Sequence, residues 1–260
     1  MNPYRAARRA AGKILRAIPW TRRNIMMMPD YRVITLVQAR DCQRLSWHSR
    51  RAARLQDLAY QVLVADMYAG KPRIDLTVAA AAVDATGLAQ PSLVEIGCGS
   101  GYYSEILLAL ARSRPIYTGI DYSAAMVERA KARYPMSAFG IGNATALPFA
   151  ENSFDIAFNG VSLMHILDYE QAIAESARVA RTAAIFHSVP VFPNHPTTFF
   201  HKYAYGGPVV ETVFNRRDLL EQFNRHGLRL IRSWRTIDYD VGAVTGSPSL
   251  AETFLCEKRR

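Results

Sequence analysis

The chain contains 260 residues, half of them apolar, and its formal net charge is +10. This composition supplies a large hydrophobic core and excludes a chain that is disordered throughout. There is no run of eighteen apolar residues, no secretory signal pattern and no cysteine spacing typical of disulfides or metal ligands. We therefore expect a cytoplasmic protein without a membrane-spanning helix.

The positive charge is concentrated at the N-terminus. Residues 1–54 hold 13 Lys and Arg against two acids, whereas residues 55–260 hold 19 against 20. Within residues 1–30, the stretch 4–18 predicts a basic amphipathic helix that ends near Pro19. Such a helix can dock on an anionic membrane surface, giving a peripheral membrane location, or on an acidic partner; it can equally be a solvated terminal helix. The neutral body argues against binding along a nucleic acid.

The next segment, residues 31–90, is predicted to be a helical extension. Apolar residues beginning with Leu55 and Leu58 recur at near-helical spacing, which predicts a helix over residues 33–69. An Ala- and Val-rich stretch predicts a second helix over residues 74–86.

From Ser92 onward, short apolar runs alternate with helical stretches. The strand-like runs lie at residues 93–96, 116–120, 138–141, 155–159, 183–187, 228–234 and 253–257. The helical stretches lie near residues 103–113, 123–134, 168–180 and 215–226. This alternation predicts βαβ units, and therefore an α/β domain over residues 91–260 in which helices cover both faces of a mostly parallel sheet.

A glycine-rich turn, Glu95-Ile96-Gly97-Cys98-Gly99-Ser100-Gly101, follows the first of these strands. Glycines permit positive φ and let a ligand approach the backbone closely. Asp121 ends the next strand, where a carboxylate can accept hydrogen bonds from both hydroxyls of an adenosine ribose. Asp121 could also be a helix N-cap, but the glycine turn upstream of it favours ribose binding.

These features alone would also fit a dinucleotide site. Such a site, however, requires the pattern G-x-G-x-x-G, whereas here the third glycine is Gly101, followed by Tyr102 and Tyr103. Glu95 within the motif would repel a pyrophosphate, but it suits an amino acid that carries a sulfonium.

Four segments resemble, in order and spacing, motifs of the class I S-adenosylmethionine-dependent methyltransferases. They are the glycine turn at 95–101, the ribose motif at 119–123, the adenine segment at 142–149 and the fourth strand at 154–159. The resemblance covers about residues 90–190, and residues 215–257 fit the family's last helix and closing hairpin. It implies a Rossmann-like seven-stranded sheet in the order 3-2-1-4-5-7-6, with strand 7 antiparallel.

Carried over residue by residue, the resemblance implies a site for S-adenosyl-L-methionine. The methionine part would be held by Glu95, Gly97 and Gly99, and Cys98 and Gly101 of the same turn would also bind the cofactor. The ribose would bind Asp121, and the adenine would lie against Tyr122, Asn143 and Ala144. Asn159 would lie near the transferred methyl. The family often has Asp at the position of Asn143, but an amide can also pair with the edge of adenine.

The sequence says less about the residues that would bind the methyl acceptor. His165 lies in the loop after the fourth strand and is a candidate base for an acceptor hydroxyl; the alternative is a packing histidine. The Pro- and aromatic-rich segment 190–213 is interpreted as a lid-like insertion that walls the substrate. Alternatively, it packs on its own sheet edge or forms a homodimer contact.

The resemblance thus implies an enzyme that methylates a small molecule, with oxygen of a sugar or other secondary metabolite as the leading acceptor. One alternative is an RNA methyltransferase anchored by the basic N-terminal region. Another is a non-catalytic protein that retains the fold. The neutral body argues against the first alternative, and the intact glycine turn with Asp121 argues against the second.

Overall fold

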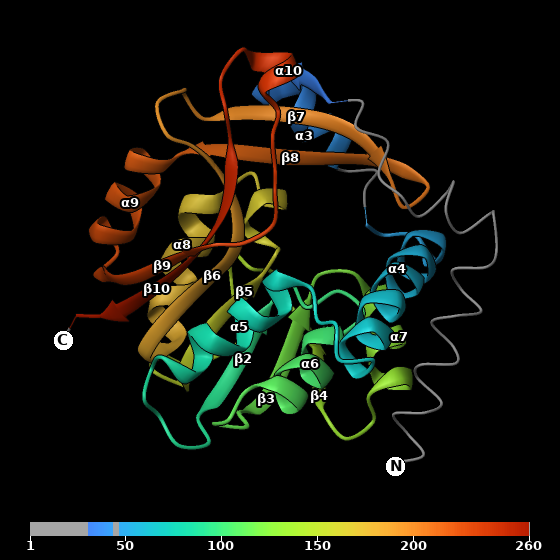
Figure 1. Cartoon of the computed structure of the whole chain (residues 1–260), viewed down its shortest axis with the longest axis vertical. Helices are drawn as coiled ribbons and strands as arrows, with labels where there is room; N and C mark the ends of the chain where they lie inside the picture. The colour runs from blue at the N-terminus through green and yellow to red at the C-terminus, as the bar shows by residue number, and fades with distance from the viewer. Residues whose placement is uncertain (1–30, 44–46, 260) are drawn as a thin grey trace.

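A computed structural model of the chain describes residues 31–43 and 47–259 (Figure 1). The basic helix predicted over residues 4–18 lies outside the described residues. The helices are α3 (Leu36–Gln43), α4 (Arg50–Tyr68), α5 (Ile74–Asp84), α6 (Tyr102–Leu110), α7 (Ala124–Arg133), η1 (Leu163–His165, a 3₁₀ turn), α8 (Tyr169–Val179), α9 (Arg216–Arg225) and α10 (Gly242–Thr245). The strands are β1 (Arg32–Ile34), β2 (Ser92–Ile96), β3 (Ile116–Asp121), β4 (Ala138–Ile141), β5 (Phe154–Gly160), β6 (Ala180–Phe192), β7 (Thr198–Ala204), β8 (Gly207–Asn215), β9 (Leu228–Arg235) and β10 (Leu250–Lys258).

A mostly parallel sheet forms the centre of the molecule. Its strands follow the order β4-β3-β2-β5-β6-β10-β9, in which β10 is antiparallel to both of its neighbours. Numbered along the chain, these seven strands have the order 3-2-1-4-5-7-6, so the predicted Rossmann-like α/β class is confirmed. The sheet differs from the prediction in three additional strands, because β8 joins the far end of β6, and β7 and β1 follow it.

Strand alternation determines which helical layer each side chain faces. In β5, Ile156 and Phe158 pack in a core with Tyr103 of α6, whereas Ala157 packs in a second core with Ile173 of α8. The sheet therefore has one hydrophobic core on each face, as expected for a parallel sheet with helices on both sides.

Capping residues fix two segments that flank the cavity described below. The Ser123 hydroxyl accepts the N–H of Met126 at the start of α7, directly after β3 ends. The Ser49 hydroxyl accepts the N–H of Ala52 (3.0 Å) at the start of α4. Each cap satisfies an N–H that the first helical turn leaves without a partner, and so holds the preceding loop in place.

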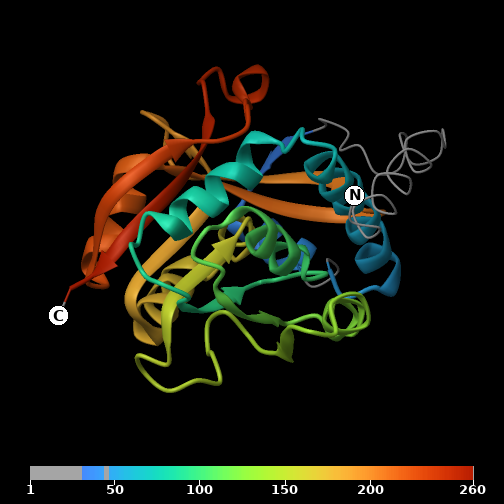
Figure 2. The ribbon, with the colours of Figure 1, turned by 60° about the horizontal axis from the view of Figure 1, so that its bottom comes forward.

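The segment 190–213 consists mainly of strands. β6 continues to Phe192, and β7 and β8 form an antiparallel hairpin. Its two-residue turn, Tyr205 and Gly206, has φ of 52° and 79°, the signs required by a type I′ turn. In Figures 1 and 2 this hairpin lies across one end of the central sheet.

The N-terminal extension differs from the prediction of one helix over residues 33–69. It contains β1 and α3 before α4, because β1 pairs with a strand far along the chain that local periodicity cannot reveal. Asp57 then ties α4 to α7: it is fully buried and accepts hydrogen bonds from Arg129 (2.7 Å) and Arg133 (2.8 Å). The helix predicted over residues 74–86 is present as α5.

Candidate active site

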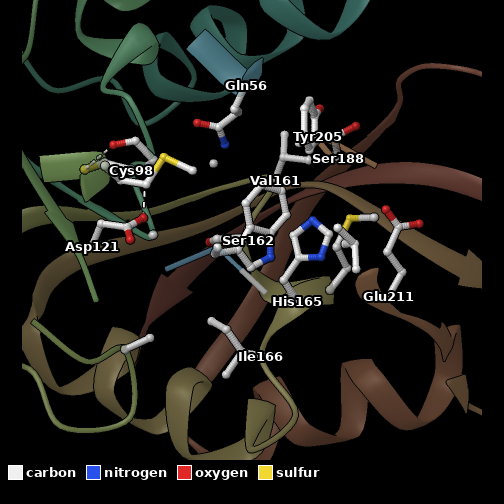
Figure 3. Close-up of a pocket in the computed structure, with 18 of the residues that line it drawn as sticks. Gln56, Cys98, Asp121, Val161, Ser162, His165, Ile166, Ser188, Tyr205 and Glu211 are labelled. Carbon is white, nitrogen blue, oxygen red and sulfur yellow. Dashed lines mark hydrogen bonds between the residues drawn. The ribbon is translucent and has the colours of Figure 1, made fainter. Parts of the chain in front are cut away.

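A large cavity lies where β2, β3 and β5 end, and its volume is about 1190 Å³. This exceeds the roughly 300–1,000 Å³ of a typical small-molecule site, so there is room for two molecules. Figure 3 shows Cys98 and Asp121 on one side of it, Tyr205 and Glu211 on the other, and Val161 between them. We call these regions the glycine-loop end and the hairpin end.

Three residues of the glycine turn, Gly97, Cys98 and Gly99, line the glycine-loop end. The φ angles of Gly97 and Gly99 are 76° and 53°, in the region that favours glycine. A Cβ on Gly97 would lie 2.5 Å from Cβ of Ser162, and one on Gly99 would lie 2.7 Å from the Gln56 amide oxygen. The glycines therefore let the turn pack tightly while its backbone borders the cavity.

Asp121 is the charged side chain held by this turn. One carboxylate oxygen accepts the N–H of Gly99 and the other accepts the N–H of Ser123, each at 2.8 Å. Burial raises the pKa of Asp121, and the two N–H donors counteract that rise. Since each oxygen retains a second lone pair, Asp121 can accept further hydrogen bonds from hydroxyls in the cavity.

Tyr122, Asn143 and Ala144 also line the glycine-loop end, as predicted for a shared site. Tyr122 is 41% exposed as a residue, and its ring meets that of His48 edge-on, with 4.8 Å between ring centroids. The side-chain oxygen Oδ1 of Asn143 accepts the N–H of Thr145 (3.0 Å), and the side-chain NH₂ group can donate elsewhere. Such a wall suits a flat heterocycle with polar edges.

Three predicted site residues, Glu95, Gly101 and Asn159, do not line the cavity. Asn159 is fully buried and donates a hydrogen bond to Ser176 of α8 (3.1 Å). Strand alternation places the next residue, Gly160, on the cavity side instead. Gly101 begins α6, and a Cβ there would come within 2.7 Å of the Phe139 ring, so its role is in packing.

Glu95 is fully buried and lies just behind the cavity wall. Its Oε2 accepts a hydrogen bond from the Tyr117 hydroxyl, while Oε1 has no hydrogen-bond partner among the described residues. A Cβ on Gly160, which lines the cavity, would overlap the Glu95 carboxylate. Burial raises the pKa of Glu95 well above 4.5; Tyr117 lowers it and Asp121 raises it further.

Gln56 of α4 is a cavity residue that sequence reasoning missed. Its Oε1 accepts the N–H of Ser100 (3.1 Å), and its side chain points toward the cavity beside the glycine turn (Figure 3). No motif could reveal it, because Gln56 precedes its partner by 44 residues and only the fold brings the two together.

His165 lies at the hairpin end, on η1. Its Nδ1 is 2.8 Å from the carbonyl oxygen of Val210, which can only accept, so Nδ1 carries the proton and Nε2 remains an acceptor. Burial lowers the pKa of His165 below 6.5, although Glu211 and the Val210 carbonyl act in the opposite direction. The imidazole is therefore neutral at neutral pH and can accept a proton.

The hairpin end also contains an ion pair between Lys202 and Glu211, whose side chains are 2% and 3% exposed. The Tyr239 hydroxyl donates to Glu211 (2.8 Å), and the Lys202 ammonium donates to the Tyr31 hydroxyl (3.4 Å). Burial acts to raise the pKa of Glu211, but Lys202, His165 and the hydrogen bond from Tyr239 together lower it. Both groups thus remain charged and satisfied by their neighbours.

Four residues on the cavity wall other than glycine have positive φ. These angles are 64° at Trp47, 59° at Val161, 53° at Ser188 and 52° at Tyr205. A backbone of this kind costs of order 1–3 kcal/mol per residue and concentrates at functional sites. For Val161 the conformation is a clear outlier, because its side chain is β-branched.

Comparison with known proteins identifies the segment around the glycine turn. A family model described as a methyltransferase domain matches residues 94–187. A probable S-adenosylmethionine-dependent methyltransferase of Mycolicibacterium smegmatis is 34% identical over 94 residues, covering 36% of this chain and 35% of that protein. The demethylmenaquinone methyltransferase of Lactococcus lactis is 33% identical over 127 residues, covering 47% and 48%. The match thus spans only a third to a half of these relatives.

Among solved structures, a 1,6-didemethyltoxoflavin-N1-methyltransferase of Burkholderia thailandensis, with bound 1,6-didemethyltoxoflavin and S-adenosylhomocysteine, has a TM-score of 0.53. The identity is 17%, and the alignment covers 83% of this chain and 92% of that one. A likeness at this identity shows a shared fold. Within the described part of the chain, no helix is long and apolar enough to cross a membrane. Residues 31–43 and 47–259 also hold no group of three His, Cys, Asp or Glu suited to a metal ion.

Proposed function

We propose that this chain transfers a methyl group to an oxygen of a small molecule. The proposal starts from the chain's membership of the class I S-adenosylmethionine-dependent methyltransferases. One observation carries the proposal: a single cavity joins the glycine turn and Asp121 to a histidine with a free acceptor nitrogen, His165. The cavity is large enough for a cofactor and an acceptor together.

The residues at the glycine-loop end fit S-adenosylmethionine. Asp121 would accept the ribose hydroxyls, and Tyr122 and Asn143 would contact the adenine. The unpaired Oε1 of Glu95, behind Gly160, provides negative charge for the cationic methionine part. When bound, the cofactor would supply a methyl group bonded to a sulfonium sulfur. An aligned nucleophile takes this methyl group by displacing the sulfur.

The protein's contribution at the hairpin end is to orient the acceptor and take its proton. The Val210 carbonyl fixes the tautomer of His165, so that Nε2 faces an acceptor hydroxyl as a base. Residues of the N-terminal extension, of segment 190–213 and of the stretch 237–240 contribute further walls, which would exclude water from the reacting groups. We propose that segment 190–213 acts as a fixed substrate wall.

Calorimetric titration with S-adenosylhomocysteine tests the proposal. Asp121→Asn is expected to weaken binding roughly 10- to 100-fold, because it removes charge-assisted hydrogen bonds of about 1.5–3 kcal/mol. Asp84→Asn is the matched control: Asp84 also accepts two backbone N–H groups, from Arg112 and Ser113, but lies outside the cavity. Absence of binding to the folded wild-type protein would overturn the proposed function.

A further inference from the structure

We propose that the acceptor is a planar aromatic compound with a hydroxyl group, rather than a sugar, an inference that rests on the proposed function. The ring would occupy an acceptor slot, defined by Trp47, Val161, Tyr205 and His165, with its hydroxyl on Nε2 of His165. All four residues line the cavity, with Tyr205 and His165 at the hairpin end and Val161 between the two ends.

Flat rings form much of the acceptor slot. The Trp47 ring lies edge-on to His165, with 5.2 Å between centroids, and tilted to Tyr205 at 5.4 Å. Figure 3 shows Val161, His165 and Tyr205 grouped around the same space. Aromatic rings pack favourably against other rings in stacked and edge-on arrangements, so these walls favour a planar ligand.

The backbone provides an independent observation. Trp47, Val161 and Tyr205 have positive φ, although they come from three separate segments of the chain. Trp47 follows α3, Val161 follows β5, and Tyr205 lies in the hairpin turn. The type I′ turn accounts for the conformation of Tyr205. The unfavourable conformations of Trp47 and Val161 around one space indicate that the shape of that space is functional.

A sugar would find few partners here. Lys202 pairs with Glu211, and Arg73 binds Asp75 through two hydrogen bonds of 2.7 and 2.6 Å. These four charged side chains are thus engaged with one another rather than available to ligand hydroxyls. A sugar carries hydroxyls around its whole ring, and each hydroxyl that is buried without a partner weakens binding.

The base also favours an aromatic hydroxyl. A phenol resembling tyrosine has a pKa near 10, and imidazole has one near 6.5, whereas water, an alcohol-like hydroxyl, has a pKa near 15.7. In the transfer, the hydroxyl proton passes to Nε2 of His165 and the acceptor oxygen bonds to the methyl carbon. The methyl–sulfur bond breaks at the same time, and sulfur keeps its electron pair. A neutral histidine suits this step better for a phenol than for an alcohol.

Calorimetry with three probes tests the inference, using protein saturated with S-adenosylhomocysteine. We expect 1-naphthol to bind and methyl α-D-glucopyranoside to bind at least 100-fold more weakly. We expect 1-methoxynaphthalene to bind less tightly than 1-naphthol, and His165→Gln to remove that difference. Trp47→Leu should weaken 1-naphthol at least 10-fold. Trp234→Leu, on β9 and outside the cavity, should leave the affinity unchanged.

The separate titration with S-adenosylhomocysteine distinguishes the two levels of the proposal and shows that each variant is folded. If S-adenosylhomocysteine does not bind, the proposed function fails, and this inference fails with it. If it binds but the glucoside binds as tightly as 1-naphthol, only the inference is overturned. Equal effects of Trp47→Leu and Trp234→Leu would also overturn it.

Discussion

The unpaired oxygen of Glu95 makes a quantitative prediction for Glu95→Gln. The wild-type carboxylate is fully buried, with Tyr117 as a hydrogen-bond donor to only one of its oxygens. A buried polar group without a partner costs about 1–3 kcal/mol, and more when it is charged. Glutamine has the same shape and no charge, so the cofactor-free variant should be more stable at pH 8 by about 1–3 kcal/mol.

The pH dependence has a definite sign. Burial raises the pKa of Glu95 in the folded protein. The stability that this group contributes is therefore complete below pH 4.5 and is lost as the pH rises through the raised pKa. Glu95→Gln should remove that decline. Urea unfolding between pH 4.5 and pH 8 measures it, as the difference in the free energy of unfolding between wild type and variant.

Although Glu95→Gln should stabilise the cofactor-free protein, it should weaken binding of the cofactor. If Glu95 provides charge for the cationic methionine part, Glu95→Gln should weaken S-adenosylmethionine binding about 10-fold or more, which is about 1.4 kcal/mol. Glu128→Gln is the control, because Glu128 is exposed and pairs with Arg50 (3.6 Å) at the protein surface. A variant that is no more stable than wild type and binds the cofactor equally well would refute the reasoning.

Three further predictions concern other parts of the site. Gly97→Ala should lower the free energy of unfolding by about 2–5 kcal/mol, because φ is positive and the new Cβ would overlap Ser162. Gly87→Ala is the control: φ is 72°, but a Cβ there would meet no atom, so urea unfolding should show a loss of only about 1–2 kcal/mol. Gln56→Ala should weaken S-adenosylhomocysteine binding severalfold by calorimetry without changing the melting temperature by more than a few degrees. His187 is fully buried with a pKa lowered to about 4 by burial, so the free energy of unfolding should fall by roughly 3 kcal/mol as pH drops from 6.5 to 4. His187→Gln should show a smaller decline over this range; an equal decline would contradict the assignment.

The strands could be predicted because their information is local, whereas their order in the sheet is implied by the resemblance to the methyltransferase family. Five short apolar runs mark the parallel strands β2 to β6, and glycines at 97 and 99 mark the turn that borders the cavity. Asp121 and Asn143 line the cavity because they directly follow or end such strands. The roles proposed for these residues depend on the binding experiments.

The prediction that Asn159 borders the cavity failed for a physical reason. Asn159 and Gly160 are neighbours in the sequence but face opposite sides of the sheet, and a motif does not show on which residue the alternation falls. The walls of the hairpin end come from segments far from the motifs, such as Trp47 and Tyr205. Their approach depends on long-range pairing of β1 with β7, which has no signature in either segment alone.

Strand β6 pairs both with the central sheet and with the β7–β8 hairpin, and this has a consequence for protein engineering. Its first part pairs with β5 in the central sheet, while Val191 and Phe192 pair with β8 of the hairpin. The chain leaves the central sheet after Phe192 and begins α9 at Arg216, so the intervening residues can change without shifting the register of the seven strands. We therefore expect that a graft of another hairpin at these two points would alter the proposed acceptor site while leaving the glycine turn in place.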